Sequence, residues 1–314
     1  MQVFHSLEEI PADFGGTVVS VGNFDGVHLA HQKVLQEVVW RARQTGAKSM
    51  AVTFEPHPVR ILRPDVAPKL ITPLPIKLKL LEGTKVDATL VIPFTRDFSI
   101  TSPRDFAGEI LARRAKAKEV HEGANFHFGH KAQGDVAKLE EFGKSLGFEV
   151  KVYPEFKMRG DVVSSSRIRE LLRSGNVERA QRLMGRAFSI VAHPGRGRGY
   201  GHKYTVPTIN LTQYEELVPA DGVYITRSAI GEEHFDSVTN VGTRPTFGEP
   251  SFAIETHLLH FHPVELTADT AVEICFLRRL RGEIKFPSID ALRAQIARDV
   301  ARARRYFHLL ERKG

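Results

Sequence analysis

Two histidines beside a glycine-rich turn suggest a phosphate-binding corner in the segment TVVSVGNFDGVHLAHQKVLQEVVWRA, residues 17–42. The β-branched run before the turn is typical of a buried strand, and the apolar spacing after it is helical. The turn therefore lies between a strand and the amino end of a helix, where free N–H groups bind anions. His28 and His31 are three residues apart and would share a helix face. The predicted phosphate-binding residues of the turn are Gly22, Asn23, Phe24, Asp25 and Gly26.

A second segment with phosphate-binding chemistry is VSSSRIRELLRSG, residues 163–175. Ser164 and Ser165 precede an apolar-periodic run, which predicts a helix that begins at the serines. Their hydroxyl and backbone N–H groups can bind a phosphate, and Arg169 lies one turn further along the same face. Each segment alone also fits an ordinary reading, a surface histidine pair or a helix cap.

The first half of the chain alternates strand-like with helical segments. Buried strands are predicted at 49–54, 88–94, 118–123 and 148–154, and helices at 102–115 and 136–147. Such alternation predicts a Rossmann-like α/β domain, with a parallel sheet that is wrapped by helices and binds ligands at the carboxyl ends of its strands.

After a short helix that ends at Gly185, the pattern changes to closely spaced strands. This change predicts a small antiparallel β-barrel with one C-terminal helix over 288–307. We therefore expect two domains, residues 1–185 and 186–314. The expected barrel strands are 188–193, 222–230, 234–242, 252–261 and 271–277.

The chain has 314 residues, a formal net charge of +7 and a pI near 9.5, which favours polyanionic partners. No RNA-recognition or helix-turn-helix signature is present, so nucleoside polyphosphates are expected rather than nucleic acid. No apolar run approaches the roughly 20 residues that span a bilayer, so no membrane association is expected. A single cysteine, Cys275, and the lack of a signal pattern favour the cytoplasm. The sequence does not decide between a monomer and a homo-oligomer.

The motif GNFDGVHLAH resembles the signature of bacterial FAD synthetases, although Ala30 stands where that signature has a glycine. Together with SSSRIR and the second half of the chain, it resembles the bifunctional riboflavin kinase/FAD synthetase family. This resemblance implies that the first domain is of the nucleotidyltransferase type. The resemblance implies that the FMN phosphate attacks the α-phosphorus of ATP and that pyrophosphate leaves. His28 and His31 would then bind the transferring phosphate. Ser164, Ser165 and Arg169 would bind the leaving pyrophosphate.

The same resemblance implies flavin-binding residues. His57 in FEPHP follows a predicted strand, and Asn125, Phe126 and Phe128 lie in the loop EGANFHFGHKAQGD, residues 122–135. An aromatic loop can stack on a flat isoalloxazine ring, but the phenylalanines could equally pack into the core. Arg244 in NVGTRPTFG is the expected flavin contact of the second half.

The segment VPTINL resembles the metal-binding motif of bacterial riboflavin kinases, which implies ATP and Mg²⁺ bound by Thr208 and Asn210, with Glu255 as the general base. Gly201 is retained from the ATP loop, but Tyr200 and His202 stand where the family has arginines. An FAD synthetase with a weak or lost kinase is therefore an alternative. A basic flavin- or nucleic-acid-binding protein without catalysis is another.

Overall fold

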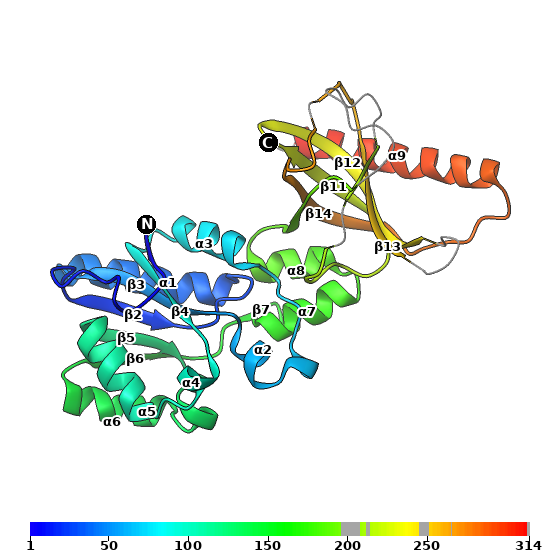
Figure 1. Cartoon of the computed structure of the whole chain (residues 1–314). Helices are drawn as coiled ribbons and strands as arrows, with labels where there is room; N and C mark the ends of the chain where they lie inside the picture. The colour runs from blue at the N-terminus through cyan, green and yellow to red at the C-terminus, as the bar shows by residue number, and fades with distance from the viewer. Residues whose placement is uncertain (196–207, 212–213, 245–250, 265, 313–314) are drawn as a thin grey trace. The chain divides into compact units, whose positions relative to one another are not determined.

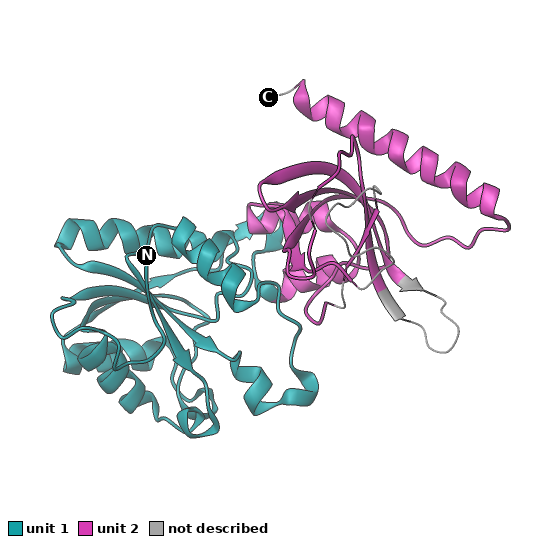
Figure 2. Ribbon diagram, turned by 45° about the horizontal axis from the view of Figure 1, so that its top comes forward, with its two compact units in different colours: residues 1–165 teal, residues 166–314 magenta. Residues whose placement is uncertain are grey.

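The fold is that of a computed structural model, which describes residues 1–195, 208–211, 214–244, 251–264 and 266–312 (Figure 1). The chain divides into two compact units, Met1–Ser165 and Ser166–Gly314 (Figure 2). This division falls before two helices that the sequence reading placed in the first domain, so the expected domain boundary after Gly185 stays a prediction. In the described residues, no helix combines the length and apolar character needed to cross a bilayer.

The first unit is built on a six-stranded parallel sheet with the strand order β1-β4-β3-β2-β5-β6. The chain moves outward from β2 to β4 on one side and from β5 to β6 on the other. The order therefore reverses between β2 and β5, and α/β sheets bind ligands at the carboxyl ends of strands beside such a reversal. The strands are β1 (Gln2–Phe4), β2 (Thr17–Val21), β3 (Lys48–Glu55), β4 (Ala88–Pro93), β5 (Ala117–Gly123) and β6 (Glu149–Tyr153).

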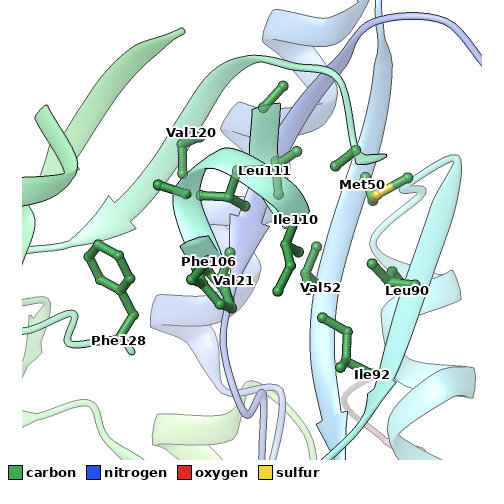
Figure 3. Packing of buried hydrophobic residues seen from close by; sticks show 14 of the residues in the cluster. Val21, Met50, Val52, Leu90, Ile92, Phe106, Ile110, Leu111, Val120 and Phe128 are labelled. Atoms are coloured by element: carbon green, nitrogen blue, oxygen red, sulfur yellow. The ribbon is translucent and has the colours of Figure 1, made fainter. Parts of the chain in front are cut away.

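Helices cover both faces of this sheet. On one face, Leu35 and Val39 of α1 (Leu29–Thr45) pack with Leu81 of α3 (Leu74–Gly83). On the other, η2 (Phe106–Arg114) and α6 (Val136–Leu146) pack on the larger cluster, in which Phe106 and Ile110 face the strands (Figure 3). The remaining elements are α2 (Pro58–Leu62), η1 (Pro64–Val66), α4 (Arg96–Ser99), α5 (Pro103–Asp105), η3 (His130–Ala132), β7 (Lys157–Met158) and β8 (Asp161–Val162).

Most predicted elements of the first half are confirmed within a residue or two, and Ser102 caps the predicted helix over 102–115 by accepting the Asp105 N–H at 3.1 Å. That helix is α-helical only at its start and continues as the π-helical η2. The helices between residues 58 and 83 were not predicted. Their first turns contain prolines, which the start of a helix tolerates but which a reading of the sequence takes as loop signals.

The second unit is built on a six-stranded antiparallel sheet with the order β10-β13-β12-β11-β14-β9. An antiparallel bridge between Pro194 and Leu211 links the two edge strands, which confirms the expected barrel. The strands are β9 (Phe188–Ala192), β10 (Thr208–Asn210), β11 (Gly222–Ile230), β12 (Glu233–Arg244), β13 (Ser251–Leu258) and β14 (Val272–Arg281); the helices are α7 (Ser165–Arg173), α8 (Val177–Met184) and α9 (Ile289–Glu311).

One face of β11, β12 and β13 carries buried hydroxyl groups that bond to one another. Thr226 contacts Ser237 at 2.8 Å and Thr239 at 2.7 Å, and Thr239 donates to Thr256 at 2.9 Å. Because side chains alternate along a strand, the residues between them project to the opposite face. There, Phe307 of α9 packs with Val223 and Val238. This face carries the candidate site of the second unit.

Candidate active sites

The turn after β2 adopts a conformation that only some residues tolerate. Phe24, Gly26 and Val27 have φ angles of 46°, 83° and 35°, in the left-handed region. A Cβ on Gly26 would also approach Ile71 to 3.2 Å. Glycine relieves both constraints at its position, and the tight turn brings the chain directly into α1.

The two histidines lie against each other at the start of α1. His28 is the N-cap, and its Nδ1 accepts the His31 N–H at 3.4 Å. Their rings stack with centroids 3.6 Å apart and planes inclined by 16°. Phe24 presents an edge to His31 at 5.2 Å between centroids. The structure thus brings the predicted pair together at the amino end of a helix, where an anion is favoured.

The environment of His31 favours its neutral form. Burial lowers the pKa of His31 well below its usual range, and charge on His28 and Lys77 lowers it further. Its Nδ1 is buried and has no hydrogen-bond partner among the described residues. A neutral imidazole donates from one ring nitrogen only, so His31 retains one unsatisfied polar atom at this corner.

Asp25 joins the turn to two other segments of the first unit. Its carboxylate accepts the backbone N–H groups of Ile71 at 3.0 Å and Thr72 at 2.9 Å. Its backbone carbonyl accepts the hydroxyl of Ser165 at 2.8 Å. The two segments that the sequence predicts to act together are therefore in contact, with Ser164 adjacent. Arg169 is buried in the second unit, so its place relative to the histidines stays a prediction.

The predicted flavin-binding residues of the first unit differ in their exposure. His57 is buried and caps α2, where its Nδ1 accepts the Val59 N–H at 3.3 Å. Phe128 is 7% exposed and packs in the core beside Phe106 (Figure 3). Phe126 stacks on Phe128 with centroids 5.4 Å apart. Asn125 is exposed. Of these residues, Asn125 and Phe126 have surface that can meet a ligand.

A cavity of about 1010 Å³ opens in the second unit between the barrel and the part of the chain that leads into α9. It has polar residues along the strands and an apolar wall from α9 and the segment before it. Ile289, Leu292, Ile296 and Val300 were expected to form an apolar stripe on the last helix, and three of these four residues line the cavity. The polar lining includes Thr208, Asn240, Glu255, His257, Arg281, Glu283 and Asp299; the apolar wall includes Ile284, Phe286, Leu292, Ile296 and Val300.

The predicted metal ligands and general base meet on adjacent strands. Asn210 of β10 is paired with Glu255 of β13, and Glu255 is paired with Asn240 of β12. Thr208 lies two residues from Asn210 on the same strand face. Its hydroxyl lies 3.0 Å from Nδ1 of His257, whose pKa is lowered by burial and by Arg304. Threonine and asparagine oxygens are ligands of the kind that Mg²⁺ accepts.

Two predicted residues cannot be placed fully. Gly201 lies outside the described residues. Arg244 is the last residue of β12, paired with Ser251, and its side chain lies outside the described part of the chain.

The sequence reading missed several charged residues of these sites. Lys77 and Glu122 are buried near the histidine corner, and Asp299 bonds to Arg281 beside the cavity. The sequence contains a weak indication that His257 belongs to the site, since it lies two residues after Glu255 and so shares its strand face. The sequence contains no indication that Lys77 is buried, because a lysine within an amphipathic helix is ordinarily taken as exposed.

Family models match both halves of the chain. The FAD synthetase model matches residues 10–167, and the riboflavin kinase model matches residues 184–307. A bifunctional riboflavin kinase/FMN adenylyltransferase of Escherichia coli K12 is 32% identical over 309 residues, which cover 97% of this chain and 96% of that protein. The chain belongs to the bifunctional riboflavin kinase/FMN adenylyltransferase family. The predicted family resemblance is thereby confirmed.

Other relatives agree across their whole length. The Haemophilus influenzae member of this family is 32% identical over 309 residues, covering 98% of this chain and 100% of its own. Among solved structures, a Streptococcus pneumoniae protein described as a macrolide-efflux protein matches with a TM-score of 0.83 at 24% identity, over 96% of this chain and 98% of that one. At that identity, the likeness shows the fold alone.

Proposed function

We propose that this chain phosphorylates riboflavin to FMN and then adenylylates FMN to FAD, with ATP as the donor in both reactions. The adenylyltransferase is assigned to residues 1–185 and the kinase to residues 186–314. The observation that carries the first assignment is the Ser165–Asp25 hydrogen bond of 2.8 Å, which joins the serine helix to the histidine corner. Family membership along the whole chain supports both assignments.

In adenylyl transfer, a phosphate oxygen of FMN bonds to the α-phosphorus of ATP while the bond to the β-phosphate oxygen breaks. The attacking group is already an anion, so no protein base is required. The protein must position the phosphates and stabilise charge that grows in the transition state. We assign His28 and His31 to the transferring phosphate, and Ser164, Ser165 and Arg169 to the leaving pyrophosphate. The turn from Gly22 to Gly26 lets the backbone approach the phosphates closely.

The flavin of this reaction would lie at the loop after β5. Asn125 and Phe126 have the surface to contact it. His57 caps α2 just beyond the carboxyl end of β3 and is the other proposed flavin residue of this unit. The core position of Phe128 supports Phe126 from behind, because the two rings are stacked. In this proposal, Phe128 therefore orients the stacking surface.

In the kinase reaction, the riboflavin 5′-hydroxyl loses a proton as its oxygen attacks the γ-phosphorus of ATP, and ADP leaves. Glu255 projects into the cavity and is the proposed base. Thr208 and Asn210 would hold Mg²⁺, which neutralises charge on the phosphate oxygens when bound. The apolar wall around Phe286 and Ile296 suits an isoalloxazine ring, and Arg244 ends a neighbouring strand.

Product analysis tests the proposal. The purified protein is incubated with ATP, Mg²⁺ and either riboflavin or FMN, and flavins are separated by chromatography while pyrophosphate is measured. We expect FMN and FAD from riboflavin, and FAD with equimolar pyrophosphate from FMN. FAD from FMN without any product from riboflavin would refute the kinase assignment. Flavin or RNA binding without turnover would refute both. Cytoplasmic localisation is part of the same proposal.

A further inference from the structure

A lysine is buried in the first unit next to the histidine corner. Lys77 lies on α3 and is 2% exposed, as a residue, on the helix side that also carries the buried Leu81. Lysines are rarely so buried without a partner, because removing an ammonium group from water costs several kcal/mol. Its position therefore needs a reason beyond the folding of α3.

The protein partners of Lys77 leave most of its hydrogen-bonding capacity unused. Its Nζ donates one long hydrogen bond of 3.4 Å to the hydroxyl of Thr53, at the carboxyl end of β3. That hydroxyl in turn donates to the backbone oxygen of Asn23 at 3.3 Å. An ammonium has three donors. The described residues give Lys77 no ion pair, so two donors remain for a ligand.

Two further orphaned polar atoms lie in the same region. Nδ1 of His31 and Oε2 of Glu55 are both buried and have no hydrogen-bond partner in the described part of the chain. Glu55 is the last residue of β3, two residues beyond Thr53 on the same face of the strand. Together with Lys77, these atoms place unused hydrogen-bonding capacity on three elements of the first unit.

Charge interactions also link these groups. The carboxylates of Glu55 and Asp25 act on Lys77, whose pKa is nevertheless lowered because burial outweighs them. Lys77 in turn contributes to the lowered pKa of His31. Asp25 already accepts hydrogen bonds from Ile71 and Thr72, so its carboxylate is largely occupied. Through Thr53, Lys77 is joined to the backbone of Asn23, in the turn that precedes the stacked histidines.

We infer that Lys77 is a catalytic residue of adenylyl transfer, which donates hydrogen bonds to the phosphoryl group bound by His31. This inference rests on the proposed function of the first unit. A compact ammonium in a site closed to water stabilises growing negative charge strongly, and it remains a proton donor in hydrogen bonds throughout the reaction. Lys77 forms no covalent bond and transfers no proton. Glu55 and Thr53 act as positioning residues that aim the ammonium.

The test compares Lys77→Met with Lys79→Met, a matched control because Lys79 is exposed on the same helix. Both kcat and KM are measured for FAD formation from FMN, together with FMN formation from riboflavin by the same protein. We expect Lys77→Met to lower kcat for FAD formation about 100-fold, as for the loss of one donor to a transition-state oxyanion. FMN formation and both activities of Lys79→Met should be unchanged.

Thermal unfolding separates catalysis from folding. Replacing an unpaired buried ion by an apolar side chain of similar length should leave the melting temperature unchanged or raise it. Thr53→Val, which removes only the hydrogen-bond partner, should lower kcat for FAD formation about 10-fold with normal FMN formation. The inference would be overturned if Lys77→Met formed FAD at a rate within about 3-fold of wild type. It would also be overturned if Lys77→Met lost both activities equally and had a lower melting temperature. Wild-type protein that makes no FAD would instead refute the proposed function itself.

Discussion

The two proposed sites handle attacking oxygens that differ in charge, one anionic and one neutral. In the first unit the nucleophile is a phosphate, and the described surroundings of the corner offer the imidazoles of His28 and His31 and the ammonium of Lys77. In the second unit the nucleophile is a neutral hydroxyl, and Glu255 lines the cavity. A carboxylate is useful only where a proton must be removed. The general base at one site and the hydrogen-bond donors at the other therefore follow from the group that attacks.

The sites also differ in how they are enclosed. The first is made of tightly packed side chains, with histidine rings 3.6 Å apart and several buried polar atoms. The second faces a cavity of about 1010 Å³ with an apolar wall from α9 and the segment before it. Packed donors suit the positioning of small, highly charged phosphates, whereas an apolar cavity suits a large flat ring. Changes at the two sites should consequently alter different kinetic constants.

The largest effect is expected when the proposed base is removed. Glu255→Gln retains the size of the side chain but cannot accept the hydroxyl proton, so kcat for FMN formation should fall about 1000-fold. FAD formation from supplied FMN should be unchanged. The control is Glu233→Gln, an exposed strand glutamate of the same unit. Normal FMN formation by Glu255→Gln would show that neither unit needs a base. The proposed contrast between the two sites would then be wrong.

His31→Ala is the reciprocal change in the first unit. It removes a donor to the transferring phosphate, so FAD formation should fall about 100- to 1000-fold while FMN formation continues. Exposed His5→Ala serves as the control. Coupled assays from riboflavin should then accumulate FMN. Equal loss of both products would mean that the two reactions do not have separate sites.

A smaller effect is expected at the wall of the cavity. Asp299 of α9 is 2% exposed and accepts from Nε of Arg281 at 2.9 Å and from Gln295 at 2.9 Å. Breaking such a buried pair leaves an uncompensated charge and loosens α9. Asp299→Asn should raise KM for riboflavin about 10-fold, equivalent to about 1.4 kcal/mol, with little change in kcat.

The control for this change lies on the same helix. The Asp290–Arg293 pair is highly exposed, with an N–O distance of 3.7 Å, and such pairs contribute little. Asp290→Asn should therefore leave KM unchanged. Hydrogen–deuterium exchange in α9 should increase in Asp299→Asn only. If KM rises without faster exchange, Asp299 contacts riboflavin directly and does not act through the helix.

The sequence predicted the folds because the relevant patterns are local. Alternating apolar segments identified β2 to β6, and Gly185 ends α8 with a φ of 74°, as predicted for a glycine cap. The same local patterns located His28, His31 and Ser165, whose contacts follow from the topology of the sheet. Helix α3 escaped prediction because its first turn contains prolines, and with it the burial of Lys77 was missed.

Other residues could not be predicted because burial is a tertiary property. Glu122 ends a strand of mixed polar and apolar residues, and only the neighbouring β2 shows that its carboxyl is enclosed. The sequence favoured flavin stacking and core packing equally for Phe128, and the structure places it in the core with Phe106. A loop phenylalanine has the same local sequence in either case.

The final prediction concerns this enclosed carboxyl, because it contrasts with Glu255. Glu122 is 3% exposed and accepts the Val21 N–H at 2.5 Å, at the reversal of strand order. Burial raises the pKa of Glu122 well above 4.5. The folded state thus keeps a proton that the unfolded state has lost. The stability contributed by this group is complete below about pH 4.5 and is lost as the pH rises through the folded pKa.

Glu122→Gln retains the acceptor for Val21 and removes the titration. At pH 8 the variant should therefore melt about 2–4 °C above wild type, as expected for about 1 kcal/mol, with a smaller difference at pH 5. Fluorescence of Trp40, the single tryptophan, follows unfolding of the first unit, in which it lies on α1. A difference that is equal at both pH values would mean that Glu122 is ionised in the fold.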